Sequence, residues 1–130
     1  MEYVLLEIET DLNKVMQVAT IYRSPNSSSE NSLNMCSLID HMCSRSGYKL
    51  FLGDFNFPNI NWNTWNAVGH SERKFIDTLQ KIFTTATRAR GFATPYLLEL
   101  IITDESFIEN IDFDAPLGKS DYSTNRISCK

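Results

Sequence analysis

The sequence lacks several features that would place a chain in a membrane, in a secretory pathway or on a polyanion. It contains no apolar run near the roughly 20 residues that a membrane-spanning helix requires. Its first residues, Met1-Glu2-Tyr3, form no basic segment followed by an apolar stretch, so we expect no secretory signal. A basic excess is also missing, because 12 basic residues stand against 16 acidic ones and leave a net charge of -4. Any contact with nucleic acid must therefore be local.

Cysteine is scarce and irregularly placed. The three cysteines, Cys36, Cys43 and Cys129, are odd in number and lack the close spacing of a metal-binding pair. Cys36 and Cys43 fall at apolar positions of a helical pattern, which predicts buried thiols. A chain without a disulfide framework fits a reducing compartment. We therefore expect an intracellular protein, nuclear or cytoplasmic, that makes no contact with a membrane.

The sequence has the composition of a globular protein, and segments with strand patterns are interrupted by two segments with helix patterns. The chain has 130 residues, 42% of them apolar, which is enough for one packed domain or part of one. Ser27 and Glu30 have the spacing of a capping box and predict a helix start at Ser27. A second helix is expected after His70, with one apolar face. Strand patterns occupy residues 4–8, 14–22, 48–52, 84–87, 97–103 and 108–113. The chain is thus predicted to be mixed α/β, in the order β-β-α-β-α-β-β-β.

The segment Gly53-Asp54-Phe55-Asn56 closes a short apolar strand with two polar side chains. Because strand side chains alternate between faces, Asp54 and Asn56 are expected to point to one side of the sheet. An aspartate there can take a proton from water, and an asparagine amide can donate to an oxyanion on phosphorus. The alternative is a plain turn, since Gly, Asp and Asn are all common turn formers. This segment alone favours the turn.

Five motifs, taken together in their order along the chain, favour a functional site over a plain turn at this segment. They are Tyr22-Arg23-Ser24-Pro25-Asn26, Leu52-Gly53-Asp54-Phe55-Asn56-Phe57-Pro58, Thr87-Arg88, Leu98-Glu99-Leu100 and Leu117-Gly118-Lys119-Ser120-Asp121. In this order they resemble the endonuclease/exonuclease/phosphatase superfamily, and within it the apurinic-endonuclease-like domain that precedes reverse transcriptase in non-LTR retrotransposons. The resemblance implies a partial four-layer α/β sandwich with a mixed sheet and two main helices. Residues 1–122 would be the C-terminal part of such a domain, and residues 123–130 an irregular tail.

The same resemblance assigns catalytic roles. Asp54 would activate the attacking water, and Asn56 would stabilise the transition state. Asp121 would lie close to a Mg²⁺ ion as a tentative ligand. Glu99 stands where the family carries an aspartate that orients a catalytic histidine, and Tyr122 stands in place of that histidine. A phenol with a pKa of about 10 carries no positive charge at neutral pH, so Tyr122 can donate a hydrogen bond but supplies no cation.

Substrate-binding residues are expected at the other motifs. Arg23, Arg88 and Lys119 each lie at a predicted strand end, where they would border a phosphate-binding groove. The alternative for each is an ordinary solvated charge. Trp62 lies in the polar loop after Pro58, where an indole can stack on a base or, equally well, anchor the loop to the core.

The activity implied by the resemblance is metal-dependent hydrolysis of a DNA phosphodiester. The upstream half of a family domain, with its asparagine and metal-binding glutamate, has no match here, so we expect this chain to be impaired as an Mg-dependent endonuclease. The alternative is a catalytically inactive remnant that acts, if at all, as a binding or interaction module. The expected partners are DNA and either the missing N-terminal half-domain or an oligomer partner that covers the exposed sheet face.

Overall fold

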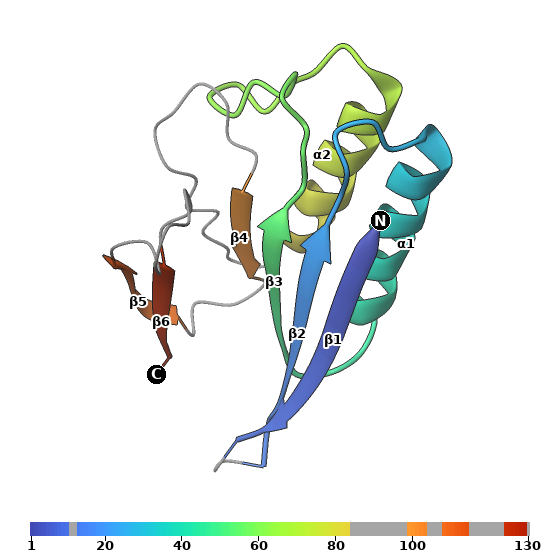
Figure 1. Ribbon diagram of the computed structural model, residues 1–130. Helices are drawn as coiled ribbons and strands as arrows, with labels where there is room; N and C mark the ends of the chain where they lie inside the picture. The colour runs from blue at the N-terminus through green and yellow to red at the C-terminus, as the bar shows by residue number, and fades with distance from the viewer. Residues whose placement is uncertain (11–12, 84–98, 104–107, 115–123, 130) are drawn as a thin grey trace.

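A computed structural model describes residues 1–10, 13–83, 99–103, 108–114 and 124–129 of the chain. Six strands and two helices occupy these residues in the order β-β-α-β-α-β-β-β (Figure 1). The strands are β1 (Glu2–Glu9), β2 (Val15–Tyr22), β3 (Tyr48–Asp54), β4 (Glu99–Thr103), β5 (Ile108–Asp114) and β6 (Thr124–Cys129). The helices are α1 (Ser29–Cys43) and α2 (His70–Phe83).

The main sheet has four strands in the order β1-β2-β3-β4. β1 and β2 form an antiparallel hairpin, β3 runs parallel to β2, and β4 runs antiparallel to β3. The parallel pair requires a crossover, which α1 provides, because two parallel strands cannot be joined by a tight turn. β5 and β6 form a separate antiparallel pair. The sheet is therefore mixed, as the sequence predicted.

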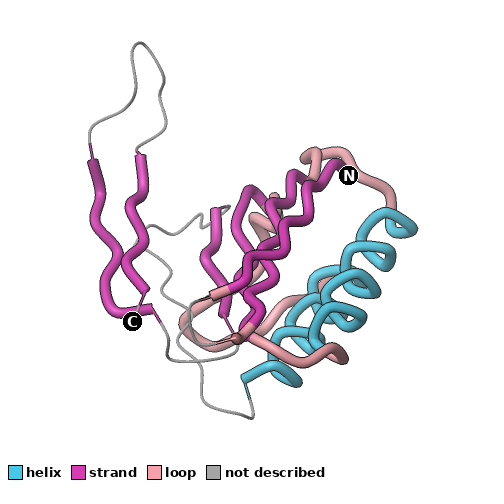
Figure 2. The backbone as a smooth tube through the Cα atoms, turned by 90° about the horizontal axis from the view of Figure 1, so that it is seen from below, coloured by secondary structure: helices cyan, strands magenta, loops and turns pink. Residues whose placement is uncertain are grey.

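Both helices cover one face of the four-stranded sheet, and the β5–β6 hairpin lies on the side away from them (Figures 1 and 2). The core between the helices and the sheet consists of aliphatic and aromatic side chains that both layers direct toward each other. Its buried members are Ala19, Ile21, Met35, Cys36, Ile39, Met42, Phe51, Phe55, Phe57, Ile60, Phe75, Ile76, Leu79 and Ile102. Burial of these groups is the main term that stabilises the helix layer on the sheet.

The opposite face of the sheet is covered only in part. Val18 and Leu50, in the two central strands, are buried there. Along β1, in contrast, Val4, Leu6 and Ile8 of this face are all exposed. Within the described part of the chain, the sheet thus carries one well-packed face and one face that becomes more open toward β1.

Two local expectations differ from the structure, and a third is not tested by it. The N-cap of α1 is Ser28, whose Oγ accepts from the N–H of Asn31 at 3.2 Å, so the prediction of Ser27 was wrong by one residue. The irregular tail at residues 123–130 was also wrong, because residues 124–129 form β6 through pairing with β5. The short strand at residues 84–87 lies outside the described residues. Within the described ranges, no helix is long and apolar enough to cross a membrane.

Candidate functional site

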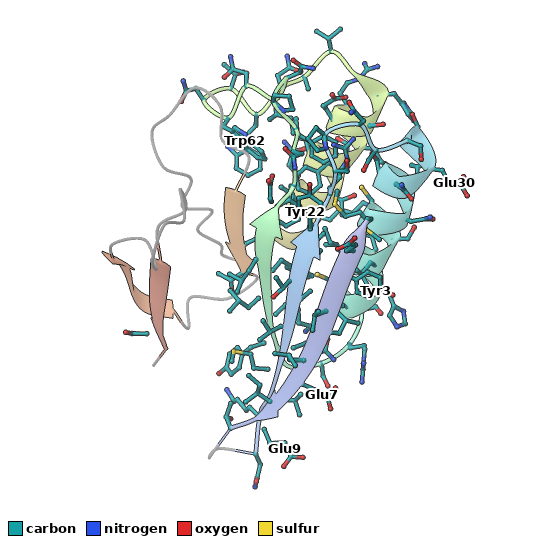
Figure 3. The ribbon with its side chains drawn as sticks, viewed as in Figure 1. Tyr3, Glu7, Glu9, Tyr22, Glu30 and Trp62 are labelled. Atoms are coloured by element: carbon teal, nitrogen blue, oxygen red, sulfur yellow. The ribbon has the colours of Figure 1, made fainter. Side chains whose placement is uncertain are left out.

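Polar residues from neighbouring strands meet at one end of the main sheet. Tyr22, the last residue of β2, is paired with Asp54, the last residue of β3, and Asp54 is paired in turn with Glu99 at the start of β4. Directly paired residues project to the same face, so the Tyr22 phenol and the Asp54 carboxylate share one side of the sheet. Tyr22 is 47% exposed and Asp54 is partly exposed. The phenol and the carboxylate are therefore accessible from solvent at the same sheet end, where Figure 3 labels Tyr22.

Gly53 explains how these two strands approach each other at that end. Its φ is +141°, in the region that favours glycine, and a Cβ on it would lie 1.9 Å from the carbonyl oxygen of Ile21. No side chain fits in that space. The glycine of the Gly-Asp-Phe-Asn segment is thus required by the close packing of β3 against β2, directly before the carboxylate.

The chain leaves strand geometry after Asp54, and a local hydrogen bond joins Asp54 to Asn56. Asn56 has a φ of 49°, and its N–H donates to Oδ1 of Asp54 at 3.1 Å. This is the local bond by which an aspartate mimics a backbone turn. The turn interpretation is therefore correct for the backbone, and the same bond orients the Asp54 carboxylate through one of its two oxygens.

A reciprocal set of hydrogen bonds joins Arg23, which follows β2, to the turn that follows β3. The Arg23 N–H donates to the Asp54 carbonyl at 2.9 Å, and Nη1 of Arg23 donates to the Asn56 carbonyl at 2.7 Å. In return, Nδ2 of Asn56 donates to the Arg23 carbonyl at 2.5 Å. We call these three bonds the Arg23–Asn56 clasp. They tie the two strand ends together and so fix the position of Asp54 relative to Tyr22.

Arg23 is held inside the protein rather than on its surface. Its side chain is 7% exposed, its Nε donates to Oγ of Ser32 at 3.1 Å, and its guanidinium lies 4.1 Å from the centre of the Phe57 ring. Burial lowers the pKa of Arg23, while the charge of Glu72 and, to a smaller extent, Cys36 act in the opposite direction. These contacts give Arg23 a structural role in the clasp, and a direct contact with phosphate stays a prediction.

Trp62 belongs to a compact loop that packs on α2. Asn61 and Asn66 exchange two backbone hydrogen bonds of 2.9 and 3.2 Å, which close the loop at its base. The Trp62 ring meets Trp65 edge-on at 5.6 Å and Phe75 at 6.4 Å between ring centres. Its Nε1 is buried and has no hydrogen-bond partner among the described residues. The geometry thus supports the anchoring alternative for Trp62, whose ring lies above the ends of β3 and β4 (Figure 3).

Other expected site residues are placed less fully or not at all. Arg88, Lys119, Asp121 and Tyr122 lie outside the described residues, and Glu99 is placed by its backbone pairing alone. The described ranges contain no group of three or more His, Cys, Asp or Glu side chains that could hold a metal ion.

Tyr22 is the site residue that sequence reasoning missed. It stood in a quoted motif, but its value depends on lying beside Asp54, and that pairing joins residues far apart in the chain. Its motif indicated only that Tyr22 lies at a strand end, and no local pattern indicated that Asp54 would be its neighbour there.

Comparisons with known proteins give one informative result. No protein-family model matches the chain, and no curated protein matches it in sequence. Among solved structures, it is similar to the endonuclease domain of TRAS1, a telomere-specific non-LTR retrotransposon, with a TM-score of 0.63 and 17% sequence identity. The match covers 95% of this chain and 59% of that chain. The chain therefore has the fold of a retrotransposon endonuclease domain over less than two thirds of that domain's length, as its motifs predicted.

Proposed function

We propose that this chain is the C-terminal part of a DNA endonuclease domain of the non-LTR retrotransposon type, with phosphodiester hydrolysis as the ancestral chemistry. The observation that carries the proposal is the position of Asp54, an accessible carboxylate at a strand end, with the Tyr22 phenol paired beside it. The fold shared with a retrotransposon endonuclease domain supports it. Fold alone does not imply function, so the proposal depends on this pair of side chains.

Asp54 is the proposed general base. Its Oδ1 accepts from the Asn56 N–H, which holds the carboxylate plane, and Oδ2 is left to accept a proton from an attacking water. The clasp keeps this carboxylate on a rigid support, because the Asp54 carbonyl is itself bonded to the Arg23 N–H. A base that is held within a fraction of an ångström of its working position loses little free energy to reorientation.

The two neighbours of Asp54 have different proposed roles. The exposed Tyr22 phenol has no hydrogen-bond partner within the part of the chain that the structure describes, and it can donate to a phosphate oxygen beside the base. Asn56 is 6% exposed, and one N–H of its Nδ2 is taken by the Arg23 carbonyl. An amide carries two N–H donors, so the second is the one that would stabilise charge developing on phosphorus. Asn56 thus serves the clasp first and the transition state second.

The described residues do not by themselves fit a divalent metal. Mg²⁺ prefers near-octahedral oxygen coordination through one or two carboxylates, water and substrate phosphate. Among the described residues, the accessible carboxylates at this sheet end are Asp54 and Glu2, which are paired with Tyr22 from its two sides, and they belong to no group of three or more possible ligands. The proposal of Mg²⁺ as cofactor therefore relies on Asp121 and on groups beyond the described ranges, and no catalytic step is assigned to the ion here.

We further propose that the isolated chain hydrolyses DNA slowly or not at all. Loss of one preorganised donor costs about 10²-fold to 10³-fold in rate. A phenol at Tyr122 in place of an imidazolium removes one such contribution, and the described ranges hold no group of three or more side chains that could bind a metal ion. The second candidate function is a non-catalytic binding module, favoured by the burial of the Asn56 amide within the clasp.

A nicking assay separates the two candidates. Supercoiled and abasic-site DNA are incubated with the purified chain and Mg²⁺ or Mn²⁺, beside Asp54→Asn and the control Asp77→Asn, which removes an exposed carboxylate of α2. The amide of Asp54→Asn can still accept from the Asn56 N–H, so the fold is retained. Slow nicking that Asp54→Asn abolishes and Asp77→Asn preserves supports the enzyme. Nicking that is equal in all three proteins, or absent, favours the binding module.

A further inference from the structure

β1 is an edge strand with only part of the usual protection against pairing with another chain. All eight of its residues are exposed, and among the described strands only β2 pairs with it. Its pairing with β2 runs without a bulge from Glu2 to Glu9, and its sequence contains no Pro, Gly or Lys. Bulges, prolines and charged side chains are devices by which edge strands avoid association, and of these β1 carries only the charges of Glu2, Glu7 and Glu9. A partner strand that sets no carboxylate against these glutamates can therefore add to this long and regular edge.

The turn of the β1–β2 hairpin shows which backbone groups face the free edge. The N–H of Thr10 donates to the carbonyl of Lys14 at 2.8 Å, so these two residues form a hydrogen-bonded pair. Such pairs alternate along an antiparallel ladder. Even-numbered residues of β1 therefore bond to β2, while the N–H and C=O groups of the odd-numbered residues 3, 5, 7 and 9 point away from the sheet.

We propose that two copies of this chain pair through β1, antiparallel about a two-fold axis that passes between the two Leu6 residues. In this register the odd-numbered residues of one copy face those of the other, as the free hydrogen-bonding groups require. On the open sheet face, Leu6 faces Leu6 and Val4 faces Ile8, so every pair there between residues 4 and 8 is apolar. The two four-stranded sheets then form one continuous sheet with both helix layers on the same side.

The distribution of glutamates in β1 is compatible with this self-pairing. With Leu6 on the axis, Glu7 faces Leu5 and Glu9 faces Tyr3 of the other copy, so no carboxylate directly opposes another. The two Glu7 side chains meet only diagonally, at about 7–8 Å. In each copy Nη2 of Arg45 lies 3.4 Å from the Glu7 carboxylate and offsets part of that repulsion. Figure 3 shows Glu7 and Glu9 in line along β1.

The neighbouring symmetric register is less favourable. An axis at Leu5 would satisfy the backbone as well. Glu7 and Glu9 face apolar residues in either register, but an axis at Leu5 would also set Glu2 against Ile8 and so partly desolvate a third carboxylate of each copy. A different partner strand would have to set apolar residues opposite Val4, Leu6 and Ile8 and no carboxylate opposite the glutamates. The β1 strand of a second copy meets both requirements. We therefore infer that the partner is a second copy of this chain.

Sedimentation velocity of the full chain tests the dimer. The wild type is expected to be dimeric at tens of micromolar, and Leu6→Lys monomeric, because it places two lysines face to face on the axis. Leu6 is 54% exposed, so the lysine variant should keep its far-ultraviolet circular dichroism. The control Val68→Lys changes a residue that is 93% exposed outside β1 and should remain dimeric. A monomeric wild type, or association that survives Leu6→Lys, overturns the proposal.

Cross-linking tests the register. In a background with Cys43→Ser and Cys129→Ser, which leaves only the buried Cys36, Leu6→Cys is expected to form an intermolecular disulfide on mild oxidation. Facing residues of a non-hydrogen-bonded pair have Cα atoms about 4.5 Å apart, within disulfide range. Leu5→Cys should cross-link poorly, because its counterpart is displaced by about two residues. Equal or stronger cross-linking of Leu5→Cys would contradict the register centred on Leu6.

Discussion

Replacing Arg23 by alanine should destabilise the fold by about 3 kcal/mol, because the guanidinium joins three parts of the molecule. It donates to the Asn56 carbonyl at 2.7 Å, to Oγ of Ser32 at 3.1 Å, and lies 4.1 Å from the Phe57 ring centre. The alanine variant removes all three contacts. It also leaves a carbonyl and a hydroxyl in the interior without their donor.

The magnitude follows from opposing contributions. Each hydrogen bond from a charged donor contributes about 1.5–3 kcal/mol, and a desolvated cation–π contact contributes up to about 2 kcal/mol. Against this stands the cost of burying the guanidinium, the same effect that lowers the pKa of Arg23. A net loss of about 3 kcal/mol remains. Arg23→Lys should lose nearly as much, because one ammonium cannot replace the fork of donors and stays buried.

Equilibrium unfolding in urea measures this loss. With a slope of about 2 kcal/mol per molar urea, the midpoint of Arg23→Ala should fall by about 1.5 M. The matched control is Arg73→Ala, an exposed arginine of α2, which should change the free energy of unfolding by less than about 0.5 kcal/mol. A loss below about 1 kcal/mol in a folded Arg23→Ala protein would refute the structural role of the clasp.

Two further predictions concern the core and its pH dependence. Gly53→Ala should prevent stable folding, since its Cβ would lie 1.9 Å from the Ile21 carbonyl oxygen. The control Gly69→Ala should be tolerated, because the atoms near its Cβ belong to the movable end of the Glu72 side chain. Circular dichroism and the solubility of both variants check this prediction. Burial raises the pKa of the Cys36 thiol in the folded protein. As the pH rises, the unfolded chain therefore loses this proton at a lower pH than the folded protein does. The free energy of unfolding should then fall by up to about 1.4 kcal/mol per pH unit above about pH 8.5. Urea midpoints from pH 7 to pH 10 should show this decline, and Cys36→Ala should lack this contribution; an equal slope in both proteins would contradict it.

The elements of the helix-covered layer were predictable because their signals are local. Apolar residues at helical spacing identified both helices, runs rich in β-branched residues identified β1 and β2, and a short apolar run between Gly47 and Gly53 identified β3. The turn at Asp54 was equally local, since its hydrogen bond joins residues two apart. β6 could not be found in this way. Its residues carry no alternating apolar pattern, and they form a strand because β5 supplies the hydrogen-bonding partner.

The sequence by itself determined which residue types stand at the strand end, including the carboxylate of Asp54 and the glycine before it. Only the tertiary structure decided which neighbours these residues meet. Arg23 was expected to border a phosphate-binding groove, with a solvated charge as the alternative. In the structure it is buried, because its guanidinium donates to the carbonyl of Asn56, 33 residues along the chain, and lies over the Phe57 ring. The same holds for Tyr22, which reaches Asp54 through the parallel pairing of β2 and β3. Strand pairing and burial depend on partners that are distant in sequence, and no local pattern around a residue indicates which distant residue it will contact.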